Sequence, residues 1–211
     1  MIGIIDYGAG NLRSISRGLI AAGADVVVSD NIDDISAADA IVLPGVGHAG
    51  HLMRSLEQLG MDKAILDAAA AGTPYLGICV GLQIMFEEQE EGNSKGLGLL
   101  PGRVSHLPRG LKTPHIGWSE VETARNTPLA PTGQRDFYYF VHSYAAAGFD
   151  PEDVVATTTY GRIFPSIVIR DHLWGCQFHP EKSSTAGIEF LRGFVSYVNT
   201  RALASAGAIS R

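Results

Sequence analysis

A cysteine between two glycines, at a junction between two different periodicities, restricts the fold of this chain more than any other feature. Thr73–Ile78 is a short apolar run typical of a buried strand, and Leu82–Phe86 reads as the opening of a helix. Between them, Gly77–Gly81 reads Gly-Ile-Cys-Val-Gly, and its glycines allow a sharp turn without Cβ clashes. Such a strand–turn–helix is the pattern of a nucleophile elbow. The N-terminus of the following helix would favour the thiolate form of Cys79.

A second strand end near the C-terminus has the same layout. Leu173–Phe178 is an apolar run, His179 ends it, and Glu181 follows two residues later. A cysteine nucleophile needs a base, and the base needs a third group to orient it. Taken singly, Cys79 also fits a buried structural thiol, and His179 fits a strand-end histidine bonded to backbone. Two matched turns favour the catalytic interpretation, with Cys79, His179 and Glu181 as a triad.

Attack on a carbonyl also requires N–H donors for the developing oxyanion. One donor is expected to be the backbone N–H of Val80, directly after the nucleophile. The second is assigned to Pro44–Gly47, within which Gly45 and Val46 follow a buried strand, although this segment also fits an ordinary tight turn. A Gly-Val-Gly strip can turn its peptide plane at low cost. We therefore hypothesise that this oxyanion hole is incomplete at rest and completed when a partner binds.

The order of apolar runs predicts an α/β fold with a mostly parallel central sheet between helices. In the first half, short strands alternate with helical patterns, which indicates βαβ units. From Gly96 to Ile169 the strand runs lose this alternation, which predicts a mixed or antiparallel extension of the sheet. We expect one domain over residues 1–200, closed by a helix that Ser183 or Ser184 caps, and a frayed tail over 201–211. The expected strands are Ile2–Asp6, Val26–Ser29, Ala40–Leu43, Gly102–His106, Phe137–His142, Val154–Thr159 and Ile167–Arg170, and the expected helices include one from Leu12 to Ile20 and Met61–Ala71.

Composition excludes several classes of function. The net charge of −6 and sequence pI near 5.6 disfavour nucleic-acid and membrane-surface binding, which need basic patches. Two cysteines among 211 residues suit a reducing compartment, and a strand directly at the start leads us to expect a cytoplasmic protein without a signal peptide. His48 and His51 have no cysteine or carboxylate cluster beside them, so we expect no metal site. Gly8-Ala9-Gly10 after the first strand resembles the start of a dinucleotide-binding loop, but Arg13 stands where that loop needs its third glycine. We therefore expect no nucleotide site.

These motifs together resemble the class I, triad-type glutamine amidotransferases, and among them the family of glutaminase subunits of imidazole glycerol phosphate synthase. The similarity runs from residue 1 to about residue 200 and implies a flavodoxin-like three-layer core. The motifs that carry it are the elbow, Ile2–Leu12, Pro44–Gly47, Pro114–Trp118, Tyr139–Tyr144 and Phe178–Ser183.

The resemblance implies that the chain hydrolyses L-glutamine without a cofactor and passes the ammonia to a barrel-fold cyclase in a heterodimer. It also implies substrate contacts at five positions and places two residues at the partner interface. The substrate positions are Gly47, Gln83, Glu91, Ser143 and Tyr144, and the interface positions are Asn11 and Lys182. For Glu91, the surrounding acidic run Glu87–Glu91 also fits a solvated loop.

Three other functions compete with this one. The chain could be a glutaminase that serves a different synthase, a non-catalytic regulatory protein on the same fold, or a cysteine peptidase or esterase. An intact triad argues against the regulatory protein, and the Tyr-Gly-Ala-Gly-Asn start argues against a different synthase. Cys176 is expected to be a core thiol, and His142 to be satisfied structurally.

Overall fold

Four strands from the first half of the chain form the parallel part of a nine-stranded sheet, in the order β2-β1-β3-β4. The computed structural model describes residues 1–127 and 132–209. Three of these strands, β1, β3 and β4, are buried along their whole length, which explains their nearly continuous apolar runs. The four strands are β1 (Ile2–Ile5), β2 (Val26–Ser29), β3 (Ala40–Gly45) and β4 (Tyr75–Cys79).

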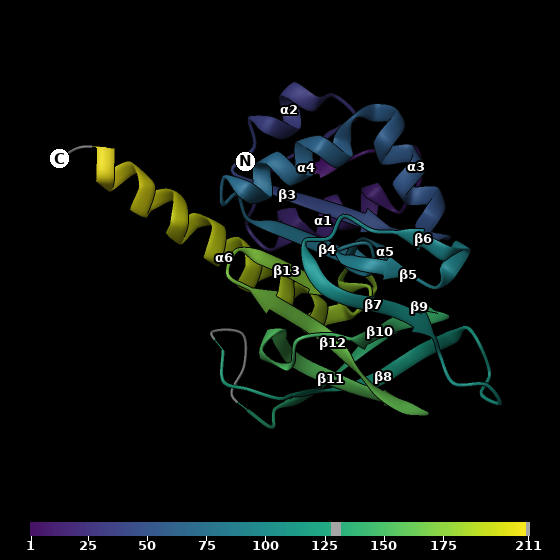
Figure 1. The fold of residues 1–211 in the computed structure, drawn as a ribbon. Helices are drawn as coiled ribbons and strands as arrows, with labels where there is room; N and C mark the ends of the chain where they lie inside the picture. The colour runs from purple at the N-terminus through teal and green to yellow at the C-terminus, as the bar shows by residue number, and fades with distance from the viewer. Residues whose placement is uncertain (128–131, 210–211) are drawn as a thin grey trace.

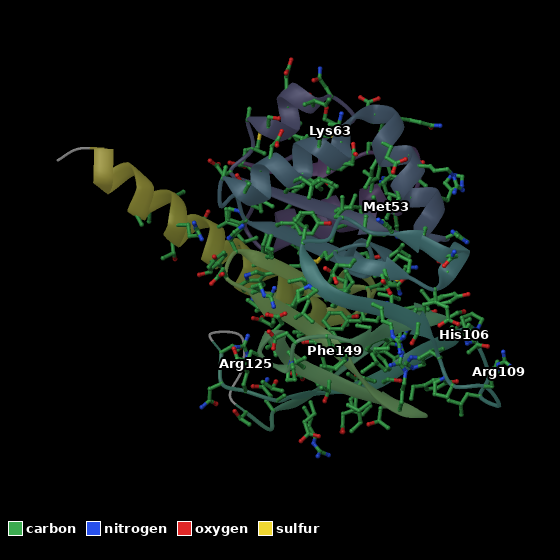
Figure 2. All side chains as sticks on the ribbon, in the orientation of Figure 1. Met53, Lys63, His106, Arg109, Arg125 and Phe149 are labelled. Atoms are coloured by element: carbon green, nitrogen blue, oxygen red, sulfur yellow. The ribbon has the colours of Figure 1, made fainter. Side chains whose placement is uncertain are left out.

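The connections between these strands are helices, as the alternating pattern predicts. Gly60 ends α3 in the left-handed conformation at φ 70° and precedes α4 directly, so the chain passes from one helix to the next without a loop. Figure 1 shows these helices around the purple and blue half of the molecule, and side chains such as the buried Met53 fill the space between helix and sheet (Figure 2). The helices are α1 (Leu12–Ala21), α2 (Ile32–Ser36), α3 (Ala49–Leu59) and α4 (Met61–Ala70).

The same sheet continues into an antiparallel half, which confirms the predicted extension. β13 pairs parallel to β4, and four antiparallel strands follow in the order β12-β11-β8-β9. Figure 1 shows this half in green, below the helices of the parallel half. Its strands are β8 (His115–Thr123), β9 (Arg135–His142), β11 (Val154–Tyr160), β12 (Arg162–Arg170) and β13 (Leu173–Cys176).

A second sheet of four strands was not predicted. The helix expected to open at Leu82–Phe86 is instead a single turn, α5 (Val80–Gln83), and Phe86 begins a strand. Phe86 is fully buried, and an aromatic side chain suits a pleated, half-buried strand. The sheet has the order β10-β7-β5-β6. Its strands are β5 (Phe86–Gln89), β6 (Ser94–Lys95), β7 (Leu100–His106) and β10 (Tyr144–Gly148).

The last element, α6 (Ser184–Ile209), packs beside α1, where Gly18 lies against Leu191. It is helical through 201–209, where the sequence predicted a frayed tail, and its alanines favour a helix. Residues 210–211 of that expected tail lie outside the described residues. In the described part of the chain, no helix is long and apolar enough to cross a membrane. The short 3-10 turns are η1 (Glu91–Asn93), η2 (Pro151–Asp153) and η3 (Pro180–Lys182).

Candidate active site

Cys79 is the last residue of β4 and directly precedes α5. β4 pairs with β13, beside which the antiparallel strands begin, and both strands lie near the centre of Figure 1. The backbone of Cys79 has φ 55° and ψ −108°, a strained conformation for a residue with a side chain. Three glycines make this turn possible. An added Cβ would lie 2.3 Å from the Gly81 nitrogen at Gly45, 2.5 Å from the Gly81 oxygen at Gly77, and 2.1 Å from the Leu43 oxygen at Gly81. The elbow is therefore held from several sides by backbone contacts.

The helix after the elbow contributes less than the sequence suggests. α5 spans only four residues, so its aligned peptide dipoles are few. What remains is local: Val80 is the first residue of α5, so its N–H has no partner within that helix. This geometry keeps Val80 available as an oxyanion donor.

His179 and Glu181 form a buried pair at the end of the second strand. His179 Nδ1 lies 2.9 Å from Glu181 Oε1, and each side chain is 4% exposed. The backbone of this turn is tied down by Ser183, whose hydroxyl donates to the His179 carbonyl at 2.6 Å and accepts the Tyr139 N–H at 2.9 Å. Ser183 or Ser184 was expected to cap the last helix. Ser183 directly precedes α6 and its carbonyl accepts the Gly187 N–H, while its hydroxyl joins the His179 turn to β9.

The protonation of His179 depends on two neighbours. Burial opposes a charge on the imidazole, but hydrogen bonds to Cys79 and Glu181 outweigh burial and raise the pKa of His179 to about 10. Part of this direction follows from geometry, since Nδ1 lies 2.9 Å from the Glu181 carboxylate. The pair therefore favours a protonated imidazole next to Cys79, as a cysteine nucleophile requires of its base.

Two further contacts reach the sulfur. Cys79 Sγ lies 3.8 Å from the Val141 carbonyl, and the side-chain nitrogen of Gln177 lies 3.7 Å from the same sulfur. Sequence reasoning missed both residues. For Gln177 a signal was available, because it is an amide inside an otherwise apolar run.

The segment predicted to carry the second oxyanion donor lies beside the elbow. In the sheet register Gly45 pairs with Cys79. The N–H of Val46 donates to the Tyr7 hydroxyl at 3.1 Å, so this donor is committed to a side chain. Gly47 has φ 81°, which only glycine adopts easily. Tyr7 was not among the predicted residues, because its contact with Val46 arises from the adjacency of β1 and β3.

A cleft of about 380 Å³ opens over Cys79. Its walls bring together all five residues assigned to substrate by resemblance, together with the triad members Cys79 and His179. It also contains three residues that were not assigned to a site: Pro114, Val141 and His142. Gly45 is not among the residues that line the cleft, and Asn11 is an exposed residue at the start of α1. The predicted substrate positions found in the cleft are Gly47, Gln83, Glu91, Ser143 and Tyr144.

Two of these residues already use part of their polar capacity. Glu91 Oε2 accepts the Ala49 N–H at 2.7 Å, at the first turn of α3. The Gln83 side-chain nitrogen donates to the Tyr144 carbonyl at 2.8 Å and to Gln177 Oε1 at 3.1 Å. Glu91 therefore presents a negative charge fixed in place, which suits an ammonium group in the cleft.

The far wall of the cleft rests on a pair of buried histidines. His142 Nδ1 lies 2.8 Å from the Tyr144 carbonyl, so this nitrogen is the donor. His142 Nε2 then accepts from His115 Nδ1 at 3.0 Å, and His115 Nε2 accepts from Ser119 at 2.7 Å. Burial lowers the pKa of His142 to about 3, with the Tyr144 bond opposing it. The geometry agrees with the structural role predicted for His142.

An exposed apolar face borders the mouth of the cleft. On β8, Ile116 and Trp118 are 56% and 52% exposed, and Phe137 on β9 is 57% exposed. The register pairs Ile116 with Val141 in the cleft and Trp118 with Tyr139. Lys182 lies 5.8 Å above the Tyr139 ring and also lines the cleft. We call Ile116, Trp118, Phe137 and Tyr139 the aromatic face. Exposed apolar patches of this kind mark protein–protein contact sites.

Among the residues that the structure describes, no group of three or more His, Cys, Asp or Glu side chains could hold a metal ion. Both cysteines are free thiols. The titratable side chains that line the cleft are those of Cys79, Glu91, His142, Tyr144, His179 and Lys182.

Comparison with known proteins gives a consistent set of relatives. The family model for glutamine amidotransferase class-I matches residues 3–196. Imidazole glycerol phosphate synthase subunit HisH of Symbiobacterium thermophilum is 50% identical over 190 residues, covering 89% of this chain and 90% of that protein. HisH of Natronomonas pharaonis is 46% identical over 203 residues, covering 92% and 93%.

Solved structures share the fold at lower identity. A crystal structure described as glutamine amidotransferase gives a TM-score of 0.76 at 18% identity, over 94% of this chain and 98% of that chain. The structure of PurLQS from Thermotoga maritima gives 0.73 at 19% identity, over 93% and 98%. These similarities show a shared architecture.

Proposed function

This chain belongs to the class I glutamine amidotransferase family, and from that premise we propose that it is the glutaminase that supplies ammonia to an imidazole glycerol phosphate synthase. The family match covers most of the chain, and the relatives named above are subunits of that synthase. The observation that carries the proposal is the buried His179–Glu181 pair beside Cys79 on a strained elbow. The relatives favour this glutaminase over one that serves a different synthase, and the buried pair beside Cys79 favours an enzyme over a regulatory protein. Activity on glutamine would separate it from a peptidase or esterase.

The reaction begins with attack of the Cys79 thiolate on the carboxamide carbon of glutamine. His179 gives its proton to the departing nitrogen, the C–N bond breaks, and ammonia leaves behind a γ-glutamyl thioester. A water molecule then gives a proton to His179 and attacks the thioester, which releases glutamate and the thiolate. Glu181 keeps the imidazole oriented through Nδ1, so the other ring nitrogen faces the sulfur.

The glutamine itself is held by the walls of the cleft. Glu91 binds the α-ammonium group, because its carboxylate is fixed by the Ala49 N–H and opens into the cleft. Gly47, Ser143 and Tyr144 bind the polar backbone of the substrate, and Gln83 lies beneath them. The side-chain amide then reaches Cys79.

The oxyanion hole is completed only when Val46 changes its bond. Val80 supplies one N–H, while the Val46 N–H points to Tyr7 in this structure. A rotation of the Gly45–Val46 peptide would point the Val46 N–H toward the oxyanion that forms beside Cys79. Each such donor lowers the activation free energy by roughly 3 kcal/mol. The Tyr7 bond supports our hypothesis that the isolated chain is held in a low-activity state.

The partner is a barrel-fold cyclase, in a heterodimer that forms in the cytoplasm. Ammonia released into bulk water would be lost, so the mouth of the cleft has to be covered. The aromatic face borders this mouth and exposes three large apolar side chains, which suits a docking surface. Lys182 lies at the junction of the cleft and this face, and Asn11 is exposed at the start of α1.

The test is release of glutamate from glutamine by the chain alone and with the cyclase plus its nucleotide ligand. We expect weak activity alone, a large increase with the liganded partner, and none for Cys79→Ala under either condition. Activity that ignores the cyclase would point to a different synthase. Activity on peptides but not on glutamine would overturn the proposal.

A further inference from the structure

A fully buried amide lies beside the nucleophile and has no role in the reaction as derived above. Gln177 directly follows β13, two residues before His179, and is 0% exposed. Its backbone N–H donates to the Ser166 carbonyl at 3.0 Å, which fixes the start of the side chain. Its side-chain nitrogen lies 3.7 Å from Cys79 Sγ. A buried amide is retained only when its hydrogen bonds are met, so the sulfur is one of its partners.

The orientation of this amide is set by a second amide. Gln83 donates one side-chain hydrogen to Gln177 Oε1 at 3.1 Å and the other to the Tyr144 carbonyl at 2.8 Å. Because Gln177 Oε1 accepts from Gln83, its nitrogen must face the sulfur. Gln83 is itself anchored, since its carbonyl accepts from the side chain of Gln89 at 2.7 Å. A line of hydrogen bonds thus runs from Tyr144 in the substrate cleft to the nucleophile.

This bond matters for one ionisation state more than the other. A thiol sulfur is a weak acceptor, whereas a thiolate carries the charge that makes an N–H donor effective. The neutral thiol can instead donate to the Val141 carbonyl at 3.8 Å. A donor that is oriented in advance and dry therefore favours the thiolate, in addition to the contribution of His179.

We propose that Gln177 is a hydrogen-bond donor to the Cys79 thiolate. Gln83 orients Gln177 and so connects Tyr144, in the wall of the cleft, to the nucleophile. The proposal rests on the assigned glutaminase function, but its test is a property of the sulfur itself. Because Tyr144 and Gln83 both line the cleft, glutamine that moves the Tyr144 carbonyl would also shift the amide that faces the sulfur.

The experiment measures thiolate formation directly. The chain has two cysteines, so Cys176→Ala leaves Cys79 as the only thiol, and its ultraviolet thiolate absorbance can be followed against pH. In that background we compare Gln177→Leu, which removes the donor, with Gln177→Glu, which also adds a negative charge. A control at another buried polar side chain is Thr158→Val, since Thr158 is 3% exposed and its hydroxyl bonds to the Glu120 carbonyl and to the Ser166 hydroxyl rather than to the sulfur or to Gln83.

We expect the midpoint of the titration to move to higher pH in the order parent, Gln177→Leu, Gln177→Glu, and to stay in place in Thr158→Val. At neutral pH, the rate of alkylation by iodoacetamide should fall roughly three- to tenfold in Gln177→Leu. Glutaminase kcat should fall by a similar factor while KM changes little. A midpoint unchanged in Gln177→Leu would overturn the proposal, and if Gln177→Leu does not fold, Gln177→Met takes its place, because it keeps a side chain of similar length without a donor and adds no charge.

The readout separates this proposal from the assigned function. Thiolate titration requires neither glutamine nor the cyclase, so Gln177 can fail while glutamine hydrolysis by Cys79 holds. Conversely, the expected shift in a chain without glutaminase activity would leave Gln177 in its role and overturn only the assigned reaction.

Discussion

Two neighbouring strand ends, β4 and β3, are paired residue to residue, yet the structure holds them in opposite ways. At the end of β4, the Cys79 elbow is enclosed by Gly45, Gly77 and Gly81, each of which approaches backbone closely enough to exclude a side chain. At the end of β3, Val46 is 38% exposed, and nothing lies within 4 Å of a Cβ added at Gly47. The Val46 N–H is held by a hydrogen bond to the Tyr7 hydroxyl.

This difference separates the tasks of the two segments. The nucleophile needs a fixed position, since small displacements from the reacting geometry slow a reaction greatly. The oxyanion donor can be the controlled part, because one hydrogen bond is small enough to be exchanged when a partner binds. The contrast predicts that changes at the β4 end are severe and that changes at the β3 end alter regulation.

The largest effect is expected from Cys79→Ala. Removal of the sulfur should lower glutaminase activity by about a thousandfold or more, with the liganded cyclase present, because no other group in the cleft can form the thioester. The measurement is glutamate release at saturating glutamine. Cys176→Ala is the control and should keep most of the activity, and equal losses in the two variants would remove Cys79 from its role.

The next effect compares a glycine from each strand end. Gly81→Ala places a Cβ 2.1 Å from the Leu43 carbonyl and should reduce the free energy of unfolding by about 3 kcal/mol. Gly47→Ala has open space and pays only for its φ of 81°, about 1 kcal/mol. Urea denaturation of both variants gives the comparison. Similar losses in the two would contradict the proposed difference in packing.

The wall of the cleft opposite these strand ends should be sensitive to acid. Burial lowers the pKa of His142 to about 3, among His115, His179 and Arg162, whereas an unfolded histidine titrates near 6.5. Below about pH 6.5 the unfolded chain therefore binds a proton at this histidine that the folded chain does not bind. The free energy of unfolding then falls by up to about 1.4 kcal/mol for each pH unit of acidification. His179, with its pKa raised to about 10, contributes a slope of the opposite sign near pH 6.5 and adds little slope well below that pH, where it is protonated in both states.

Chemical denaturation between pH 7 and 5 checks this point. His142→Gln removes the titrating group and keeps a donor and an acceptor, so the loss of stability on acidification should be smaller than in the parent. Identical slopes in the two proteins would mean that His142 is not the acid-sensitive group.

The smallest effect is expected from Tyr7→Phe, which removes one hydroxyl and releases the Val46 N–H. A single hydrogen bond of about 1 kcal/mol corresponds to a several-fold rise in glutaminase activity without the cyclase. In the complex, where that bond is already exchanged, the variant should match the parent. A decrease in activity without the partner would mean that Tyr7 helps to form the oxyanion hole instead of keeping the Val46 N–H away from it.

Much of the fold could be predicted, because periodicity reports burial. β2 matches the predicted Val26–Ser29, and the elbow strand and the final helix lie close to their expected positions. The second sheet was missed because Phe86–Gln89 is short and its acidic residues resemble a loop. Whether four apolar and polar residues form a helix turn or a strand depends on what covers them, which no local pattern reports.

The site divides in the same way. Cys79 and His179 stand out because their motifs are local, and the cleft contains the substrate positions suggested by resemblance. Tyr7 and Gln177 act through neighbours that are 39 and 98 positions away in sequence, so only the strand order brings them into contact. Their roles remain predictions that the variants above address.

The most direct test of a rigid nucleophile beside a controlled oxyanion strand is acid-quenched mass spectrometry of the γ-glutamyl thioester. Protein mixed with glutamine is quenched at short times, with and without the liganded cyclase, and digested. We expect a glutamyl adduct on the peptide that carries Cys79, forming slowly in the chain alone and much faster in the complex. An adduct that forms equally fast without the partner, or none on Cys79 in the active complex, would contradict it.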